Sequence, residues 1–419
     1  MANLTKTQLF LLVAWLSLTS MACNKATTTA VTTQSKIEQQ QQSAPAVTSG
    51  EVVMGAAQIK KYVPLLEGKR VALMSNQTGM VGDKHTLDLM LENGVNVVTI
   101  FSPEHGFRGN ADAGEHVSSS VDEKTGVPIA SLYDGKSPMP SREVMDGIDI
   151  IVTDIQDVGL RFYTYYVTMI NLMDAALTYG KQFMVLDRPN PNGMYVDGPI
   201  LDMTLKSGVG RLPIPTVHGM TLGELAQMAN GEGWLKEGGK CDLTVIPCEN
   251  YTHQTRYELP IAPSPNLPNM LSIYLYPSMC YFEGTTVSLG RGTDWPFQVY
   301  GHPDMTGYAF EFTPTSRPGA KSPTQMDKLC HGVDLHNLNA EDVIAKGINL
   351  EYVIDAYNNL TKNGHQFYLK SNFFDKLMGT TRVREMIAQG KSAEEIKETW
   401  KADVELFKVQ RRPYLLYQE

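Results

Sequence analysis

Residues 95–110 are Val95-Asn96-Val97-Val98-Thr99-Ile100-Phe101-Ser102-Pro103-Glu104-His105-Gly106-Phe107-Arg108-Gly109-Asn110. The apolar run Val95–Phe101 predicts a buried strand, which a proline and two glycines then end abruptly. An acid, an imidazole and a guanidinium follow at Glu104, His105 and Arg108. Loops of this kind at the end of a buried strand are where α/β proteins place their chemistry, and a polar turn with a helix cap is the structural alternative.

Strand-like and helical stretches alternate around this segment. Further strand-like runs are Arg70–Met74, Ile129–Tyr133, Ile148–Thr153, Phe183–Leu186 and Leu243–Ile246. Helical spacing is found at Met54–Tyr62 (closed by Pro64 and Gly68), at His85–Leu91, at Thr168–Thr178, and from Thr221 through Ala229 with Glu224 placed for a capping box. This alternation predicts an α/β domain with a Rossmann-like, mostly parallel sheet.

Four of the strand candidates end in polar loops that contain glycine or proline. The carboxyl ends of parallel strands meet at one edge of a sheet, so we expect these loops to converge on a single site. The loop after the first strand is Ser75-Asn76-Gln77-Thr78-Gly79, and neither G-x-G-x-x-G nor a P-loop occurs. The sequence therefore argues against a dinucleotide as the ligand.

The character of the chain changes after residue 262. Pro263-Ser264-Pro265-Asn266-Leu267-Pro268-Asn269 predicts an extended junction. Short strand-like runs and helices follow, the helices near Ala340–Lys346, Ile354–Leu360 and Ala393–Leu406. We expect a Rossmann-like domain over 53–262 and a smaller α+β domain over 263–419.

The first 52 residues predict export instead of folded structure. Residues 1–22 have the charged start, apolar run and small residues of a signal peptide, and Cys23 after Ala22 resembles a bacterial lipobox. We expect lipidation of Cys23 and a periplasmic or outer-membrane-associated lipoprotein, with simple secretion as the alternative. Residues 23–52 are rich in Thr and Gln and predict a disordered tether.

Composition narrows the classes of function. The chain has 419 residues, 42% hydrophobic and 19% charged, with a net charge of −9, so no basic surplus favours nucleic acid. The cysteines after the predicted tether, Cys241, Cys248, Cys280 and Cys330, show no metal-ligand spacing, and the nine histidines form no H-E-x-x-H motif. A catalytic metal is a rival that this sequence does not favour.

Carboxyl groups are the main chemical resource of the predicted loops. Glu104 follows one strand, and Asp154 and Asp157 follow another. Burial would raise the pKa of Glu104 whereas His105 or Arg108 would lower it, so its direction stays open. Glycoside hydrolysis uses two carboxyl groups, or one with a substrate acetamido group, and both routes are available.

Several motifs together resemble one family. They are Gly68-Lys69-Arg70-Val71, Ser75–Gly79, Phe101–Gly109, Ala111-Asp112-Ala113-Gly114, Asp154–Gly159, Arg161-Phe162-Tyr163-Thr164-Tyr165, Leu186–Pro191, His218–Glu224, Pro263–Asn266, Glu283-Gly284-Thr285, Gly290–Thr293 and Arg412–Tyr417. The chain from about residue 54 to its end is similar to the secreted exo-β-N-acetylmuramidases of the NamZ type. One departure is Asp294-Trp295, where that family would have Thr-Arg.

The resemblance implies a cofactor-free glycoside hydrolase with its active site in a cleft between the two domains. It implies release of N-acetylmuramic acid from the non-reducing end of peptidoglycan fragments, with Glu104 as the acid/base. The catalytic candidates are Glu104, His105, Asp157 and Glu283. The substrate-binding candidates are Asn76, Gln77, Arg108, Asp154, Gln156, Arg161, Tyr163, Arg188, Asn190, His218 and Arg291.

Three points stay open. The stabiliser of the anomeric centre is Asp157, Glu283 or the substrate acetamido group, and the lactyl carboxylate meets Arg108, Arg161 or Arg291. Arg188 and His218 either line the cleft or serve only local structure. A non-catalytic peptidoglycan- or sugar-binding lipoprotein is the alternative function, with a metal-dependent hydrolase behind it.

Overall fold

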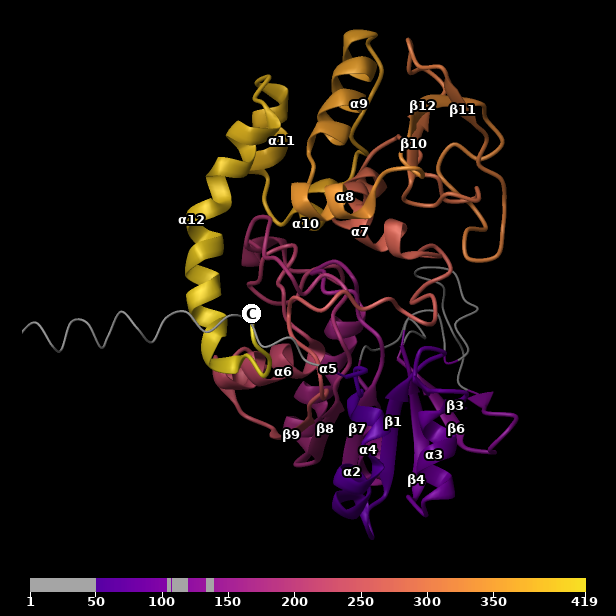
Figure 1. Cartoon of the computed structure of the whole chain (residues 1–419), viewed down its shortest axis with the longest axis vertical. Coiled ribbons are helices and arrows are strands. Elements are labelled where there is room, and N and C mark those ends of the chain that lie inside the picture. Colours follow the sequence, from indigo (N-terminus) through magenta and orange to yellow (C-terminus); the bar gives the residue numbers. More distant parts are fainter. Residues whose placement is uncertain (1–49, 104–106, 108–119, 133–138) are drawn as a thin grey trace, which may run out of the picture. The chain divides into compact units, whose positions relative to one another are not determined.

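A mainly parallel sheet forms the centre of the first part of the chain. The computed structural model describes residues 50–103, 107, 120–132 and 139–419. Within these ranges the sheet has seven strands, and Figure 1 shows most of them. In sheet order they are β5 (Ser120–Val121), β6 (Pro128–Ser131), β4 (Val97–Ser102), β1 (Val71–Ser75), β7 (Ile150–Asp154), β8 (Gln182–Leu186) and β9 (Asp242–Ile246).

The pairing confirms the predicted sheet and adds one edge strand. All neighbouring strands from β6 to β9 are parallel, whereas β5 pairs antiparallel with β6. The register of β1 against β7 sets Ser75 beside Asp154. The loops after both strands therefore begin at the same edge of the sheet.

Side chains of the central strands alternate between two cores, as expected for a sheet covered on both faces. Ala72 and Met74 of β1 belong to the larger core, and Val71 and Leu73 to the smaller one. The larger core includes residues of α4 (Arg142–Asp146), α5 (Tyr165–Tyr179) and α6 (Leu222–Gly231). The smaller core includes residues of η2 (Gly55–Ala57), α2 (Ile59–Leu66) and α3 (Thr86–Glu92).

Side-chain caps and packing explain where α6 begins and why the predicted bounds of the first helix are wrong. The capping box predicted for α6 is present, with Thr221 and Glu224 bonding reciprocally. The first helix was predicted over Met54–Tyr62, closed by Pro64 and Gly68. Instead, η2 covers Gly55–Ala57, and α2 begins at Ile59, contains Pro64 and ends at Leu66, two residues before Gly68. Tyr62 and Leu66 are both buried at this i, i+4 spacing, so packing onto the sheet outweighs the lost backbone hydrogen bond.

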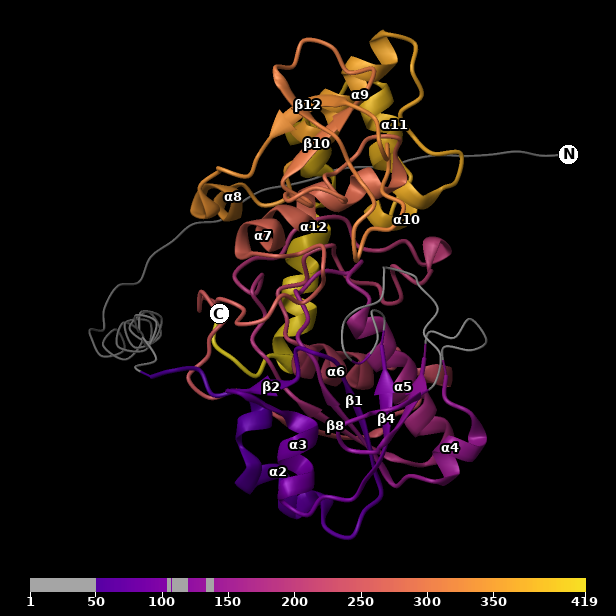
Figure 2. The ribbon, with the colours of Figure 1, turned by 90° about the vertical axis from the view of Figure 1, so that its right-hand side faces the viewer.

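The second part of the chain combines helices with a small antiparallel sheet, as Figure 2 shows. In that sheet β12 (Cys330–Asp334) lies between β10 (Val299–His302) and β11 (Phe310–Phe312). The remaining elements are α7 (Met270–Met279), η5 (Cys280–Gly284), α8 (Ala340–Lys346), α9 (Glu351–Lys362), α10 (Phe373–Met378), α11 (Arg382–Ala388), α12 (Ala393–Arg411) and η6 (Arg412–Tyr414). Short elements outside both sheets are the hairpin β2 (Met80–Val81) and β3 (Lys84–His85), η3 (Met203–Leu205) and η4 (Lys236–Gly238).

The last helix returns the chain to the Rossmann-like part. Figure 1 shows α12 running from α11 to the vicinity of α6. There the Gln410 amide and the Tyr414 hydroxyl both donate to the carboxylate of Glu232, just after α6. No helix in the described ranges is long and apolar enough to cross a membrane.

Candidate active site

The polar loops after β1, β7 and β8 form one buried network at the carboxyl edge of the sheet. Asp154, the last residue of β7, forms an ion pair with Arg188, two residues after β8. The guanidinium donates through Nε at 2.6 Å and Nη2 at 3.0 Å, and Thr86 Oγ1 donates to the same carboxylate at 2.5 Å. Both partners are buried, so this pair fixes the loops to one another and is not open to a ligand.

Three predicted amides are also used internally. Asn76 Nδ2 donates to the Tyr165 hydroxyl, while Gln156 Nε2 donates to the carbonyls of Asp157 and Pro189. Asn190 Nδ2 donates to the Met220 carbonyl at 2.9 Å. Each amide joins separate loop segments, so these side chains shape the edge of the sheet.

Asp157 is a buried carboxyl with one unused oxygen. Its Oδ1 accepts from the Gly159 amide at 2.7 Å, and its Oδ2 has no hydrogen-bond partner among the described residues. Burial raises the pKa of Asp157 to about 7, and backbone donors counteract part of this rise. With Arg188 and Asn190 it lines a cavity of about 10 Å³, room for about one water molecule. Asp157 can therefore hold a proton beneath the loops, but this cavity does not admit a sugar.

Gly159 fixes the turn that follows Asp157. Its φ of +76° lies in the left-handed region, and a Cβ at this position would overlap the Asn190 amide. Glycine is therefore required for the Asp157 loop to pack against the segment after β8.

Arg161 is fully buried and serves the backbone. Its Nη1 donates to the carbonyls of Pro199 and Ile214, and its Nη2 donates to the carbonyl of Leu377 in α10. Burial lowers the pKa of Arg161, and no carboxylate pairs with it within the described ranges. The guanidinium ties the two parts of the chain together and has no opening toward a substrate carboxylate.

The predicted junction segment is held against the strand-end loops by an aromatic cluster. The hydroxyls of Tyr163 and Tyr165 donate to the Pro263 carbonyl at 2.9 and 3.1 Å. Gln77 Nε2 approaches the same carbonyl at 3.4 Å, and Gln77 Oε1 has no partner among the described residues. The Tyr163 ring contacts Tyr276 of α7 edge to face, at 6.2 Å between centroids.

The same cluster leads to the pair formed by Glu283 and Arg291. Tyr276 packs edge to face on Phe297, and the Arg291 guanidinium lies over the Phe297 ring at 5.3 Å. Arg291 Nη2 donates to Glu283 Oε1 at 2.7 Å. Both side chains remain about one quarter exposed. Among the predicted site residues that the structure describes, this pair combines opposite charges with access to solvent.

His218 is buried and neutral. Its Nδ1 accepts from the Met220 amide at 3.2 Å, and its Nε2 has no partner among the described residues. Burial and the nearby Arg411 and Arg161 lower the pKa of His218 to about 3. The local structural role, one of the two alternatives, is the one that the geometry favours.

Several predicted residues lie outside the described residues. They are Glu104, His105, Arg108 and Cys23. The predicted active-site cleft between the domains stays a prediction, because Glu104, its expected acid/base, lies outside the described residues. The four other cysteines, Cys241, Cys248, Cys280 and Cys330, are buried and form no disulfide. In the described ranges, no three or more His, Cys, Asp or Glu side chains are grouped so as to hold a metal ion.

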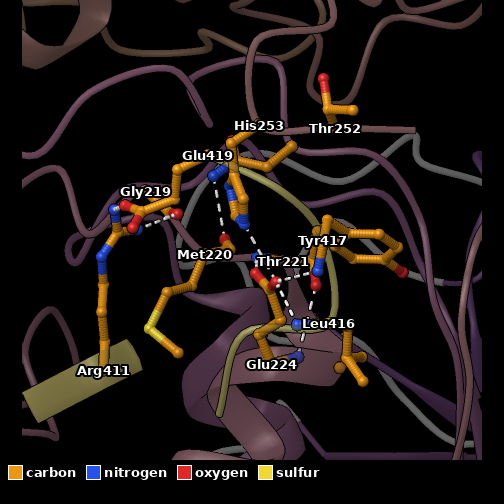
Figure 3. Close-up of polar contacts among 12 residues, drawn as sticks. Gly219, Met220, Thr221, Glu224, Thr252, His253, Arg411, Leu416, Tyr417 and Glu419 are labelled. Carbon is orange, nitrogen blue, oxygen red and sulfur yellow. Dashed lines mark hydrogen bonds and ion pairs between the residues drawn. The ribbon is translucent and has the colours of Figure 1, made fainter. Parts of the chain in front are cut away.

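The sequence did not identify a second buried network, centred on Glu224. Besides capping α6, its carboxylate meets His253 Nε2 at 3.0 Å and accepts from the Leu416 amide at 2.8 Å (Figure 3). Asp187, directly after β8, accepts from the hydroxyls of Thr221 and Tyr417, both at 2.6 Å. The available signals were three motifs that contain its members, Leu186–Pro191, His218–Glu224 and the terminal Arg412–Tyr417.

These observations define an α/β protein whose carboxyl and guanidinium groups gather at the carboxyl edge of a Rossmann-like sheet. Models of the exo-β-N-acetylmuramidase NamZ N-terminal and C-terminal domains match residues 71–271 and 274–417. The chain belongs to this NamZ family, as the motifs indicated.

Individual relatives agree with this assignment. The chain is 40% identical over 374 residues to the peptidoglycan β-N-acetylmuramidase NamZ of Bacillus subtilis (strain 168), covering 85% of this chain and 89% of the relative. The crystal structure of a DUF1343 family protein from Bacteroides fragilis is similar with 63% identity and a TM-score of 0.82, over 88% of this chain and all of that one. A second B. fragilis DUF1343 structure has 29% identity and a TM-score of 0.75, over 89% of this chain and all of that one.

Proposed function

We propose that this protein is an exo-acting β-N-acetylmuramidase that releases N-acetylmuramic acid from the non-reducing end of peptidoglycan fragments. The observation that carries the proposal is membership of the NamZ family across both parts of the chain. The B. subtilis relative, a peptidoglycan β-N-acetylmuramidase, supports it. The convergence of polar loops at the carboxyl edge of the sheet provides a suitable location.

Within this proposal Glu104 protonates the glycosidic oxygen, and His105 orients the Glu104 side chain. Asp157 is only 6% exposed, so we assign it no contact with the sugar. The positive charge that develops at the anomeric carbon is then stabilised by Glu283 or by the substrate acetamido group. Glu283 is the more accessible of the two described carboxyl candidates.

The Glu104→Gln variant tests the acid/base role. Loss of the transferable proton is expected to lower kcat on a chromogenic N-acetylmuramic acid glycoside at least about 100-fold. Glu123→Gln is the matched control, because Glu123 is an exposed glutamate just after β5. Near-normal turnover by a folded Glu104→Gln protein would remove Glu104 from the role. Muropeptide binding by the wild type without any turnover would support a sugar-binding lipoprotein instead.

Arg291 is the described arginine that we assign to the lactyl carboxylate. Arg291 donates only Nη2 to Glu283 and is partly exposed. Arg161, in contrast, is buried and donates to backbone carbonyls. Lysine keeps the charge but loses the planar fork, so Arg291→Lys is expected to raise KM about tenfold for the muramic acid glycoside relative to the N-acetylglucosamine glycoside. Arg317→Lys, in an exposed pair with Asp294, is the control. An equal change for both glycosides would contradict this assignment.

The same proposal places the protein outside the inner membrane. The lipobox-like Ala22-Cys23 supports a lipid anchor at Cys23, with peptidoglycan fragments as the substrates within its reach.

A further inference from the structure

The last residues of the chain, 412–419, form a tail that is inserted among the loops that follow the parallel strands. Tyr417 is buried, and its hydroxyl donates to Asp187 Oδ2 and accepts from the Cys248 amide at 2.8 Å. The backbone amides of Leu416 and Tyr417 donate to Glu224 Oε1, as Figure 3 shows. The tail thus supplies donors to two buried carboxyl groups of the Rossmann-like part.

Arg411 holds the start of this tail in place. Its Nη1 donates to the carbonyls of His218 and Gly219, and its Nη2 pairs with the carboxylate of Glu419 (Figure 3). The His253 amide donates to the Gln418 carbonyl at 2.8 Å. These contacts fix the tail at both ends of the segment that carries Tyr417.

Asp187 joins the tail to the candidate active site through consecutive residues. Arg188 holds Asp154 at the end of β7, and the Pro189 carbonyl accepts from Gln156 at 2.7 Å. Gln156 also bonds the carbonyl of Asp157. A displacement of Asp187 is therefore transmitted within three residues to the β7 end and to the Asp157 loop.

We propose that Tyr417 is a positioning residue of the active site, which fixes Asp187 and, through residues 188 and 189, the loop that begins at Asp154. This inference rests on the proposed function for its catalytic consequence, while the mechanical coupling stands on the contacts alone. A purely structural tail would stabilise the chain without affecting the exchange of that loop or the pH profile of the reaction.

The groups around Asp187 set the pH at which its carboxyl takes up a proton. Thr221 and the Gly223 amide face it from the start of α6, and Glu224 faces it from the same helix. Cys248 and Tyr251 face it from the segment after β9, and Tyr417 faces it from the tail. Burial raises the pKa of Asp187 to about 6, while the hydrogen bonds from Thr221, Tyr417 and Gly223 lower it. Loss of the Tyr417 hydroxyl removes a donor to the ionised form, so Asp187 takes up its proton at a higher pH.

The test compares Tyr417→Phe with Tyr414→Phe in the full-length protein. Tyr414 lies on the same tail, but its hydroxyl donates to the exposed Glu232. For Tyr417→Phe we expect faster deuterium uptake over residues 154–160, a kcat on the muramic acid glycoside lowered about tenfold, and an acid limb moved up by about one pH unit. Tyr414→Phe is expected to change none of these quantities.

Each result decides one part of the proposal. Unchanged deuterium uptake over residues 154–160 in a folded Tyr417→Phe protein would overturn the coupling, whatever the activity. Faster uptake with unchanged kcat and pH profile would overturn the catalytic role. A wild type that binds muropeptides without turnover, yet shows the uptake change in Tyr417→Phe, would reject the proposed function and retain the coupling. If Tyr417→Phe does not fold, Arg411→Lys replaces it, because Arg411 holds the tail without contacting Asp187. Uptake over residues 154–160 must then rise together with that over residues 416–419, and a rise over residues 416–419 alone would overturn the coupling.

Discussion

At the scale of single residues, burial separates side chains that shape the site from those that can meet a ligand. Asn76, Gln156 and Asn190 lie in the predicted loops, yet the amide of each donates a hydrogen bond to another protein group. Glu283 and Arg291 keep part of their side chains exposed. In the sequence, the three amides and the Glu283–Arg291 pair look equally suited to bind a ligand, because all are polar residues in predicted loops or motifs. Only their hydrogen-bond partners and exposure in the structure distinguish the two sets.

Asp157 gives a pH-dependent prediction at this scale. Its folded pKa of about 7 lies above its ordinary value of about 4, so the folded chain binds one more proton than the unfolded chain between these pH values. Stability from this group is therefore present at low pH and lost as pH rises toward 7, by up to about 1.4 kcal/mol per pH unit. Asn has no such titration, and we expect urea unfolding of Asp157→Asn to gain on the wild type between pH 4 and pH 7. Parallel pH curves for the two proteins would contradict the burial argument.

At the scale of elements, the sequence predicted the strands well because their apolar runs are short, buried and ended by polar loops. The run at Ile148–Thr153 appears as β7 (Ile150–Asp154), and Phe183–Leu186 appears within β8. The sequence missed α4, α10 and α11, which have five to seven residues and show too few turns for a periodic pattern. It also missed α7, because residues 272–279 are all buried and show no amphipathic pattern, and because Pro277 lies inside the helix.

The candidate site was predictable in location but not in its internal contacts. The convergence of the loops at the carboxyl edge followed from the predicted parallel arrangement of the strands. Arg188, the ion-pair partner of Asp154, is 34 residues away, and Tyr417, one of the partners of Asp187, is 230 residues away. No local spacing indicates such pairs, because they depend on how β8 and the tail are placed in three dimensions.

The helix caps provide a prediction at the scale of elements. Thr221 and Ser392 both close capping boxes, at α6 and α12. Thr221 also donates to the buried Asp187, whereas Ser392 is exposed. We expect Thr221→Ala to lower the free energy of unfolding by about 2 kcal/mol or more, and Ser392→Ala by about 1 kcal/mol. Equal losses in urea titrations would mean that the Asp187 contact adds nothing to the cap.

At the scale of the whole molecule, one large core and several buried polar contacts join the two parts of the chain. Arg161 bonds carbonyls from both parts, and the tail after α12 returns to the start of α6. The family models likewise match both parts, over residues 71–271 and 274–417. The Rossmann-like part is therefore incomplete without the end of the chain, even though the two are far apart in sequence.

The proposed anchor gives the prediction at this largest scale. If Cys23 carries the lipid, only the Thr- and Gln-rich residues 24–52 lie between it and the predicted Rossmann-like domain in the sequence. The enzyme would then act on fragments close to the membrane surface. We expect Cys23→Ala, expressed with its leader in a Gram-negative host, to move the protein from the membrane pellet to the soluble fraction with its kcat unchanged, because the site lies in the folded part. Thr27→Ala is the control and should stay in the pellet. A Cys23→Ala protein that remains in the pellet would exclude lipidation as the cause of attachment.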